Sequence, residues 1–334
     1  MQTSNMAKEI ASQPDIIRNI LKTHLQNNSI TGFCQINNFE RICIIASGTS
    51  KNAANFGKYY FEQISKITTN VEYASEFLEK EPFFNEKDLV IFISQSGKST
   101  DVINALTKTQ KTNAGTLALV NDINSPLAQN VDCAVDLQAG QELAVPATKS
   151  FSATIVKLFL LSLKFAQNKN IDIKNNLRDL KNLPDSIESL LMSAKISKVA
   201  QNFDAQIILG RGLNYFACKE ISLKLKEAAL VTSIYYPLGE FIHGHMIMLT
   251  KIHSILAFLF DFDTLHNEDK KIIEKIQKKY NPKIQIIDES YFSLKSKYLT
   301  PLLAVIMFQA IGLIIAEQKG IDPDSPEGLS KVAI

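Results

Sequence analysis

The apolar segments of this chain recur at a nearly constant offset, and this repetition limits the possible folds more than any other feature of the sequence. The run Ile207–Gly212 restates the run Ile42–Gly48, and Ser254–Phe260 restates Leu89–Ser94. An offset of about 164 residues that is kept from one segment to the next is the signature of an internal repeat. The sequence therefore predicts two homologous domains in tandem.

Within each predicted domain, short apolar segments alternate with helix-like segments. In the first half, the segments predicted as strands or strand ends are residues 41–46, 72–77, 88–93, 115–120 and 133–137. Parallel strands that are joined by helices are buried on both faces and therefore read as apolar runs. We expect an α/β fold in which ligands bind beyond the carboxyl ends of the strands. A long apolar helix is predicted to close each domain.

The segments outside the repeat predict the domain boundaries. Residues 6–25 have helical spacing, with Pro14 near the start of the main part, and residues 167–185 are polar and rich in Asn and Lys. We interpret the first segment as a helical arm and the second as a linker. The predicted parts are an arm at 1–35, a first domain at 36–168, a second domain at 186–320 and a C-terminal tail at 321–334.

The end of one predicted strand has the composition of an anion site. The apolar run Ile91–Ile93 stops at Ser94-Gln95-Ser96-Gly97, and a helix-like segment follows. The first-turn N–H groups of a helix are unpaired, the helix dipole is positive there, and hydroxyls add donors. We interpret this stretch as a phosphate cradle, although an ordinary N-cap explains the motif when it is considered alone. The second domain has Phe260-Asp261-Phe262-Asp263 at this place, and its carboxylates are predicted to repel phosphate.

A nucleoside triphosphate site of the Walker type is excluded at the same stretch. Gly97-Lys98-Ser99 resembles the end of a P-loop, but that motif needs a glycine five residues earlier, where Phe92 stands.

Charge and composition exclude further classes of function. The formal net charge is +2, and the lysines are spread rather than clustered with aromatic residues, so no nucleic-acid partner is predicted. The longest apolar run, at 302–316, is interrupted by Gln309 and Gly312 and is shorter than the roughly 20 residues that span a membrane. We expect a buried helix there and no membrane partner. Charged residues near the N-terminus argue against a signal peptide.

The cysteines have no paired spacing. They are Cys34, Cys43, Cys133 and Cys218. Neither a zinc site nor a disulfide framework is expected from this pattern, and a reducing cytoplasmic location is predicted.

Two segments in the second half carry residues suited to proton transfer. Lys224 and Glu227 are three apart on a strongly helical segment and therefore share a face, although a solvated ion pair is the ordinary interpretation of such spacing. The segment Gly239–His245 places two glycines around a histidine, so its backbone can approach a ligand. A metal held by His243 and His245 is disfavoured because no third ligand accompanies them. A carboxylate near a neutral imidazole suits proton shuttling in a sugar.

With these motifs in view, the chain resembles the sugar isomerase (SIS) domain family. It is similar to the isomerase half of the glutamine–fructose-6-phosphate amidotransferases and to the type II glucosamine-6-phosphate deaminases. The matching motifs fall in family order along nearly the whole chain: Met6–Pro14, Ala46–Ser50, Ser94–Gly97, Glu142–Lys149, Leu209–Gly212, Leu223–Glu227, Gly239–Gly244 and Leu329–Lys331. The resemblance implies two SIS domains, each a five-stranded parallel sheet flanked by helices in a flavodoxin-like three-layer arrangement.

The resemblance also implies roles for individual residues. The residues expected to hold the sugar phosphate are Thr49, Ser50, Ser94, Gln95, Ser96 and Ser99. Val145 is expected to lie over the sugar through its backbone, and the tail is expected to cover the site with Ser330 and Lys331. In the synthases, a lysine at the position of Lys331 can form an imine with the ketose.

Besides Lys331, three residues are implied to carry the chemistry of the sugar. Glu227 is expected to move a proton between C1 and C2, and Lys224 to support the enediol region. His243 is expected to help open the pyranose ring and, as in the family, to reach in from the partner subunit. The chain departs from the family at Glu327, where the tail usually has an arginine, and at Lys98, where an acidic residue is frequent.

The direction of the reaction follows from mass action. The chain shows no glutaminase domain that would supply ammonia, and water is abundant, so we expect conversion of glucosamine 6-phosphate to fructose 6-phosphate and ammonia. A fructosamine 6-phosphate deglycase is an open alternative with the same glutamate and histidine, and a sensor of sugar phosphates without catalysis is another. We expect a homodimer with a shared active site, a small hexosamine phosphate as ligand, and no metal or other cofactor.

Overall fold

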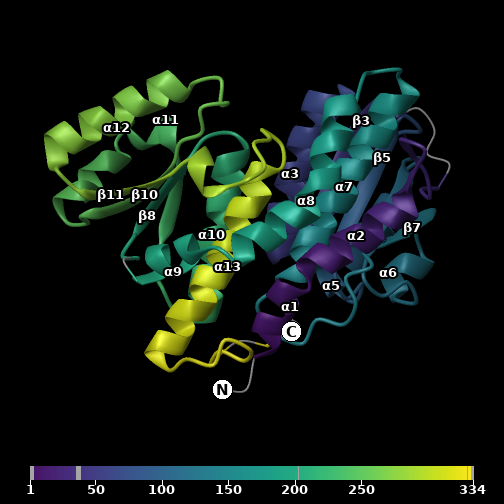
Figure 1. Cartoon of the computed structure of the whole chain (residues 1–334). Coiled ribbons are helices and arrows are strands. Elements are labelled where there is room, and N and C mark those ends of the chain that lie inside the picture. The colour runs from purple at the N-terminus through teal and green to yellow at the C-terminus, as the bar shows by residue number, and fades with distance from the viewer. Residues whose placement is uncertain (1–3, 35–38, 202, 329, 332–334) are drawn as a thin grey trace. The chain divides into compact units, whose positions relative to one another are not determined.

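The computed structural model describes residues 4–34, 39–201, 203–328 and 330–331, and its contacts divide them into two compact units. One unit consists of residues 12–142 and 149–181, and we call it the five-stranded unit. The other consists of residues 4–11, 143–148 and 182–331, and we call it the four-stranded unit. Figure 1 labels many of the helices and strands of both units. The domain boundaries expected from the sequence stay predictions.

The five-stranded unit is built on a parallel sheet with the strand order β4-β3-β5-β6-β7. This is the flavodoxin-like order, in which the chain reverses direction along the sheet between its first and third strands. The strands are β3 (Arg41–Ala46), β4 (Thr68–Tyr73), β5 (Asp88–Ser94), β6 (Gly115–Val120) and β7 (Cys133–Asp136). Strand β4 differs most from the expected range of residues 72–77, because it begins at Thr68 and residues 74–78 already form helix α4.

Helices cover both faces of this sheet, as the apolar strands predict. On β3, Ile44 meets the face of α3 and α7, while Cys43 and Ile45 pack with residues of α4, α5 and α6. Alternate residues of a strand point to opposite faces, so a strand buried on both sides has an unbroken apolar run. The helices are α3 (Gly48–Tyr60), α4 (Ala74–Leu78), α5 (Thr100–Thr109), α6 (Pro126–Gln129) and α7 (Lys149–Asn168), and the π-helix η1 (Phe61–Ser65) follows α3.

The predicted N-terminal arm forms two helices instead of one. Helix α1 (Asn5–Ala11) belongs to the four-stranded unit and α2 (Gln13–His24) to the five-stranded unit. The break follows from Ser12 as N-cap and Pro14 in the first turn of α2, where proline needs no N–H partner. A two-stranded hairpin, β1 (Leu25–Gln26) with β2 (Ser29–Ile30), follows.

The segment predicted as a polar linker is largely helical. Helix α8 (Lys174–Leu191) begins inside it, and Leu177, Leu180 and Leu183 are buried along one face. The polar Asn and Lys residues that indicated a linker lie between these leucines, as on any amphipathic helix.

The four-stranded unit repeats the same order, as β11-β10-β8-β9, with all neighbours parallel. Its strands are β8 (Ile207–Gly210), β9 (Ile234–Pro237), β10 (Ser254–Phe258) and β11 (Lys283–Ile287). Helices α10 and α13 cover one face and α11 and α12 the other. The helices are α9 (Ala194–Gln201), α10 (Leu213–Ala229), α11 (Leu238–Phe241), α12 (His266–Tyr280) and α13 (Thr300–Lys319), with the short turns η2 (His245–Thr250) and η3 (Glu289–Tyr291).

The expectation of five strands in the second domain is wrong for the described residues, which give four. Residues 292–296 alternate between buried and exposed as a strand would, but they pair with no strand. Two of these residues, Leu294 and Ser296, bond to the first residue of α13 instead. The Ser296 N–H donates to the Thr300 hydroxyl at 2.9 Å, and this hydroxyl donates to the Leu294 carbonyl at 2.9 Å.

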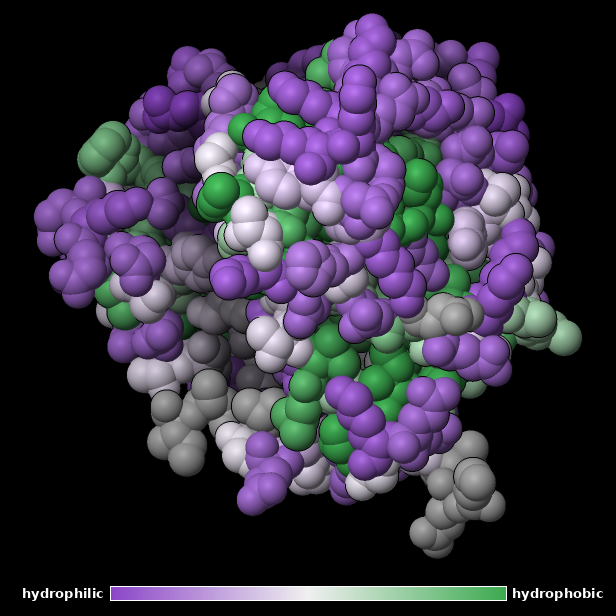
Figure 2. Space-filling view, turned by 90° about the vertical axis from the view of Figure 1, so that its left-hand side faces the viewer, coloured by the Kyte–Doolittle hydropathy of each residue, from purple (hydrophilic) through white to green (hydrophobic). Residues whose placement is uncertain are grey.

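Helix α13 is long and apolar enough to cross a membrane, with a mean hydropathy of 1.9 over 18 residues. Its 20 residues exceed the predicted run, but 78% of that window is buried, so it is a core helix of the unit, as predicted. The lysine-rich α12, in contrast, contributes a hydrophilic surface to the face shown in Figure 2.

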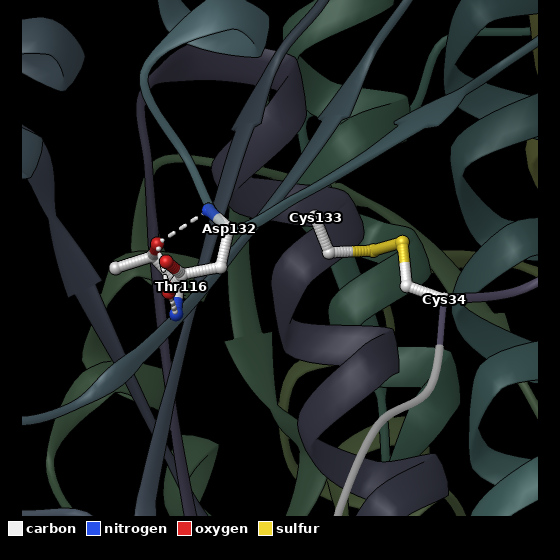
Figure 3. Close-up of a disulfide and its surroundings, with 4 residues drawn as sticks. All are labelled: Cys34, Thr116, Asp132 and Cys133. Carbon is white, nitrogen blue, oxygen red and sulfur yellow. Dashed lines mark hydrogen bonds between the residues drawn. A yellow bond between two sulfur atoms is a disulfide. The ribbon is translucent and has the colours of Figure 1, made fainter.

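The expectation that no disulfide forms is wrong. Cys34 and Cys133 are bonded, with their Cα atoms 6.1 Å apart, although 99 residues separate them in the sequence (Figure 3). Next to Cys133, the Asp132 carboxylate accepts hydrogen bonds from the Thr116 hydroxyl and N–H at 2.7 and 2.8 Å. Sequence spacing missed the disulfide because the fold brings the chain after β2 to the edge strand β7. Cys43 and Cys218 are buried free thiols.

Candidate active site

In the five-stranded unit, two polar turns lie side by side at the carboxyl edge of the sheet. The turn after β3 holds Thr49 and Ser50 at the start of α3, and the turn after β5 holds residues 94–99 before α5. Strands β3 and β5 are hydrogen-bonded neighbours in register, with Ala46 opposite Ile93. They flank the point where the strand order reverses, which is the usual ligand position in such sheets.

The backbone of the predicted phosphate cradle is a tight loop around Gly97. Gly97 has a φ of +62°, and a Cβ there would lie 2.0 Å from the Ser125 hydroxyl, so this position requires glycine. Its N–H donates to the Ser94 hydroxyl at 3.1 Å, and the Lys98 N–H donates to the Ser96 hydroxyl at 3.2 Å. Ser99 is the N-cap of α5, with no side-chain capping bond.

The environment of this loop is mixed in charge. The Lys98 ammonium lies 3.7 Å from the Asp122 carboxylate, and both groups are exposed. Lys51, one residue past Ser50, is buried with its ammonium 4.5 Å above the centre of the Tyr73 ring. The loop therefore offers serine hydroxyls and the N-terminus of a ten-residue helix, which together suit a phosphate.

In the four-stranded unit, helix α10 carries a buried charged group along one face. The Lys224 ammonium bonds to the Glu227 carboxylate and lies 3.5 Å from the Glu220 carboxylate. Glu220 and Lys224 are almost fully buried, whereas the Glu227 side chain is 23% exposed. The solvated ion pair that spacing alone favours is therefore wrong, because Lys224 is inside the unit. Glu227 is the member of this group that solvent, and hence a substrate, can reach.

Glu220 was not predicted from the sequence as a partner of Lys224, although its spacing indicated this role. It precedes Lys224 by four residues, the spacing at which a glutamate and a lysine face each other on a helix.

His243 lies at the end of a short helical turn and is exposed. The backbone N–H of His243 donates to the Glu240 carbonyl at 2.9 Å. Gly244 follows with a φ of +102°. Next to it, the ring of His245 stacks on Tyr236 with the ring centres 4.2 Å apart. No hydrogen bond or ion pair joins His243 to Glu227 among the residues that the structure describes.

The tail lies against the loop 143–148 in the same unit. The Val145 N–H donates to the Asp324 carbonyl at 2.8 Å, and the Lys331 ammonium donates to the Ala144 carbonyl. Ser330 is exposed beside Lys331. Glu9 of α1 holds the other side of the loop by accepting the N–H groups of Leu143 and Ala144. This network brings Val145 and Lys331 together, while Leu329 lies outside the described residues.

Most of the predicted site residues that the structure describes thus form two groups. The first is the serine-rich edge of the five-stranded unit. The second, in the four-stranded unit, contains Glu227 with Lys224, and Lys331 with the backbone of loop 143–148. No three His, Cys, Asp or Glu side chains in the described part of the chain lie close enough to hold a metal ion. The absence of a cofactor stays a prediction.

Comparisons with known proteins show the family of the chain. The family model described as "SIS domain" matches residues 35–163 and 204–290. The chain is 31% identical to a glutamine–fructose-6-phosphate aminotransferase (isomerizing) from Caldanaerobacter subterraneus and 32% identical to one from Aquifex aeolicus. Each alignment covers 98% of this chain, which spans 58% and 57% of the length of those relatives.

Solved structures show the same fold. The C-terminal domain of glucosamine-fructose-6-phosphate aminotransferase from Francisella tularensis has a TM-score of 0.87 and 28% identity, covering 96% of this chain and 98% of that one. A glucosamine-6-phosphate deaminase from Thermotoga maritima has a TM-score of 0.80, with 99% of both chains covered. At 23% identity, the second likeness shows the fold alone.

Proposed function

The chain belongs to the SIS domain family of sugar isomerases, and on this basis we propose that it is an isomerising deaminase. In this proposal it converts glucosamine 6-phosphate and water to fructose 6-phosphate and ammonia. The observation that carries the proposal is the Glu227 carboxylate, which is partly exposed and bonded to the buried ammonium of Lys224.

A carboxylate in this position suits proton transfer between neighbouring carbons. His243 assists opening of the pyranose ring to give the aldehyde at C1. Glu227 removes the C2 proton, and the C2–H electron pair forms the C1=C2 double bond of an enolamine while the C1=O π pair moves to O1, which takes a proton from solvent. The Glu227 carboxyl then returns its proton to C1. The C2 carbon is then a protonated imine, and water releases it as ammonia and a ketone. A positioned general base of this kind contributes about 10²–10⁴-fold to a rate.

The phosphate end of the substrate is assigned to the loop Ser94–Ser99, with Thr49 and Ser50 beside it. The support for this assignment is the position of both turns at the point where the strand order reverses, and the glycine conformation that brings the loop backbone close to a ligand.

The deaminating direction rests on the fate of the C2 imine. Water is in large excess over free ammonia, so the imine is hydrolysed unless ammonia is delivered to it directly. The relatives at 31–32% identity are named for the synthetic direction, and this favours the amination of fructose 6-phosphate as the second candidate. The deglycase reaction uses the same residues and differs in the size of the amine.

The test is a coupled assay of fructose 6-phosphate and ammonia release from glucosamine 6-phosphate. We expect turnover by the purified chain, and a fall of at least about 10²-fold in Glu227→Gln. Glu274→Gln, an exposed residue of α12, is the matched control and should keep full activity. Absence of turnover in the wild type would overturn the proposal. Turnover only from fructose 6-phosphate with added ammonium selects amination, and turnover only of a 6-phosphofructosyl amino acid selects the deglycase.

We also propose that the enzyme is a homodimer in which His243 serves the partner's active site. The exposure of His243 supports this assignment. Mixing inactive Glu227→Gln and His243→Asn proteins should restore roughly a quarter of the wild-type activity, because half of the dimers then carry one intact site. If the mixture stays inactive while light scattering reports dimers, the sharing of the site is refuted.

A further inference from the structure

The carboxyl edge of the four-stranded unit holds an internal ion pair where the five-stranded unit has its proposed phosphate cradle. Arg211 follows β8 as Ser47 follows β3, and Asp269 lies in the first turn of α12, the helix that follows β10 as α5 follows β5. Strands β8 and β10 are the pair at which the strand order reverses in this unit. Ligands usually bind at such an edge, and here Arg211 pairs with the Asp269 carboxylate of the same unit.

The ion pair is well formed. The Arg211 Nε donates to both Asp269 oxygens at 2.9 and 3.0 Å, and its Nη2 donates to one of them at 2.6 Å. The Asp269 side chain is only 4% exposed. Hydrogen bonds to Asp269 raise the pKa of Arg211, so the guanidinium keeps its charge. A planar guanidinium held at two nitrogens has a fixed orientation, which a lysine does not provide.

The outer edge of this guanidinium lies against Gly239. A Cβ at Gly239 would lie 3.2 and 3.3 Å from the two terminal nitrogens of Arg211, so even alanine would be tight there. Gly239 is the second residue of α11, and the same turn continues to His243 through the hydrogen bond from the His243 N–H to the Glu240 carbonyl. Because Gly239 has no side chain, its backbone can lie in close contact with the Arg211 guanidinium of the same unit.

The other side of the turn is fixed by apolar packing. Leu238 and Phe241 are fully buried in one cluster with Ile273 and Ile276 of α12. Helix α11 packs against β8, β9, α12 and η2. Of these, β8 directly precedes Arg211 and α12 contains Asp269. The segment that ends at His243 thus rests on an apolar base and on the guanidinium of Arg211.

We propose that Arg211 and Asp269 are positioning residues that hold the Gly239–Gly244 turn and thereby set the position of His243. This inference rests on the proposed function, since it assigns His243 to ring opening. In this proposal, the carboxyl edge of the sheet in the five-stranded unit binds the substrate phosphate. The corresponding edge in the four-stranded unit holds the Arg211–Asp269 ion pair and supports the turn that carries His243.

The test is a double-mutant cycle on the full-length protein with glucosamine 6-phosphate as the substrate. Asp269→Asn and, separately, Gly239→Ala should lower kcat by about 10-fold and leave KM within about twofold, because the phosphate cradle is untouched. In a His243→Asn background, either change should lower kcat by less than about twofold, because its effect acts through His243. Asp269→Glu should recover part of kcat. Arg178→Lys, at an exposed ion pair on α8, is the control.

Equal losses in both backgrounds, or a loss confined to KM, would overturn the proposal. Amide hydrogen exchange separates this outcome from a failure of the proposed function. In Asp269→Asn and Gly239→Ala, exchange should rise about 10-fold within residues 238–250 and stay unchanged within residues 94–99. This change should appear even if the wild type does not turn over glucosamine 6-phosphate. Unchanged exchange within 238–250 in both variants would refute the support of the turn.

Discussion

The N–H of Val145 donates a hydrogen bond of 2.8 Å to the carbonyl oxygen of Asp324, so a loop in the middle of the sequence is tied to the C-terminal tail. The carboxylate of the same aspartate accepts the N–H groups of Asn5 and Met6, each at 2.7 Å. One residue therefore connects the start of α1, the loop 143–148 and the tail, and the resemblance to the family implies that the last two of these cover the substrate.

Removing this side chain should release the tail. In Asp324→Ala, two N–H groups at the start of α1 lose their partner, and we expect the unfolding free energy to fall by about 1–2 kcal/mol, as for the loss of a helix cap. Limited proteolysis should cut within residues 320–331 several-fold faster. Glu317→Ala, exposed at the end of α13, is the control. An unchanged cleavage rate in Asp324→Ala would contradict this role.

The buried carboxylate of Glu220 should matter for stability as well as for the site. In Glu220→Gln, the buried Lys224 ammonium loses a negative neighbour at 3.5 Å. Breaking a buried ion pair in this way costs about 3–5 kcal/mol, and urea denaturation should show a loss of this order. We also expect a lower kcat, because Lys224 is no longer held from both sides beside Glu227. Glu274→Gln should change neither quantity, and equal midpoints for both variants would argue against the buried ion group.

Lys157 should make stability depend on alkaline pH. Its ammonium is buried in the five-stranded unit, bonded to His24 and Gln138 at 2.7 and 2.8 Å, and burial lowers its pKa to about 8. Between about pH 8 and 10.5 the unfolded chain then binds more protons than the folded one, so the unfolding free energy rises with pH across this window. Below pH 8 the destabilisation is complete, and its upper limit is about 3 kcal/mol for a shift of this size.

Replacing Lys157 tests the predicted rise of the unfolding free energy with pH. Lys157→Met should be more stable than the wild type at pH 7, and its stability should no longer rise between pH 8 and 10. Lys164→Met, on the same helix and part-exposed, should retain the slope. The measurement is urea unfolding at several pH values. A wild-type stability that falls as the pH rises through this window would contradict the assignment.

The disulfide between Cys34 and Cys133 should stabilise the oxidised protein. A cross-link over 99 residues restricts the unfolded chain and contributes about 2–4 kcal/mol in typical cases. Cys34→Ser should therefore have a lower Tm than the wild type under non-reducing conditions. With reductant present, the two proteins should have the same Tm. Thiol titration of the denatured wild type should find two of the four cysteines free before reduction. Four free thiols in oxidised protein would show that the bond does not form.

The arrangement of strands was predictable because its signal is local. Apolar runs such as those of β3 and β5 show burial on both faces, and the repeat with its constant offset requires a second domain of the same kind. The turn of Ser94–Ser99 between β5 and α5 was predictable for the same reason, and its role as an anion site stays a prediction. The absence of a fifth strand from the described residues of the second domain was not predictable, because Leu294 and Ser296 bond to the Thr300 hydroxyl instead of to a neighbouring strand.

The sequence by itself determined the fold class, the repeat and the candidate residues, because each depends on periodicity or on residues that are neighbours in the chain. Only the tertiary structure decided that Lys224 is buried between two carboxylates, that Cys34 reaches Cys133, and that the guanidinium of Arg211 rests on Gly239. These are contacts between residues far apart in the sequence or on a helix face whose burial the sequence leaves open. Burial decides whether a charge is solvated or held, and it becomes defined only when separate segments pack together.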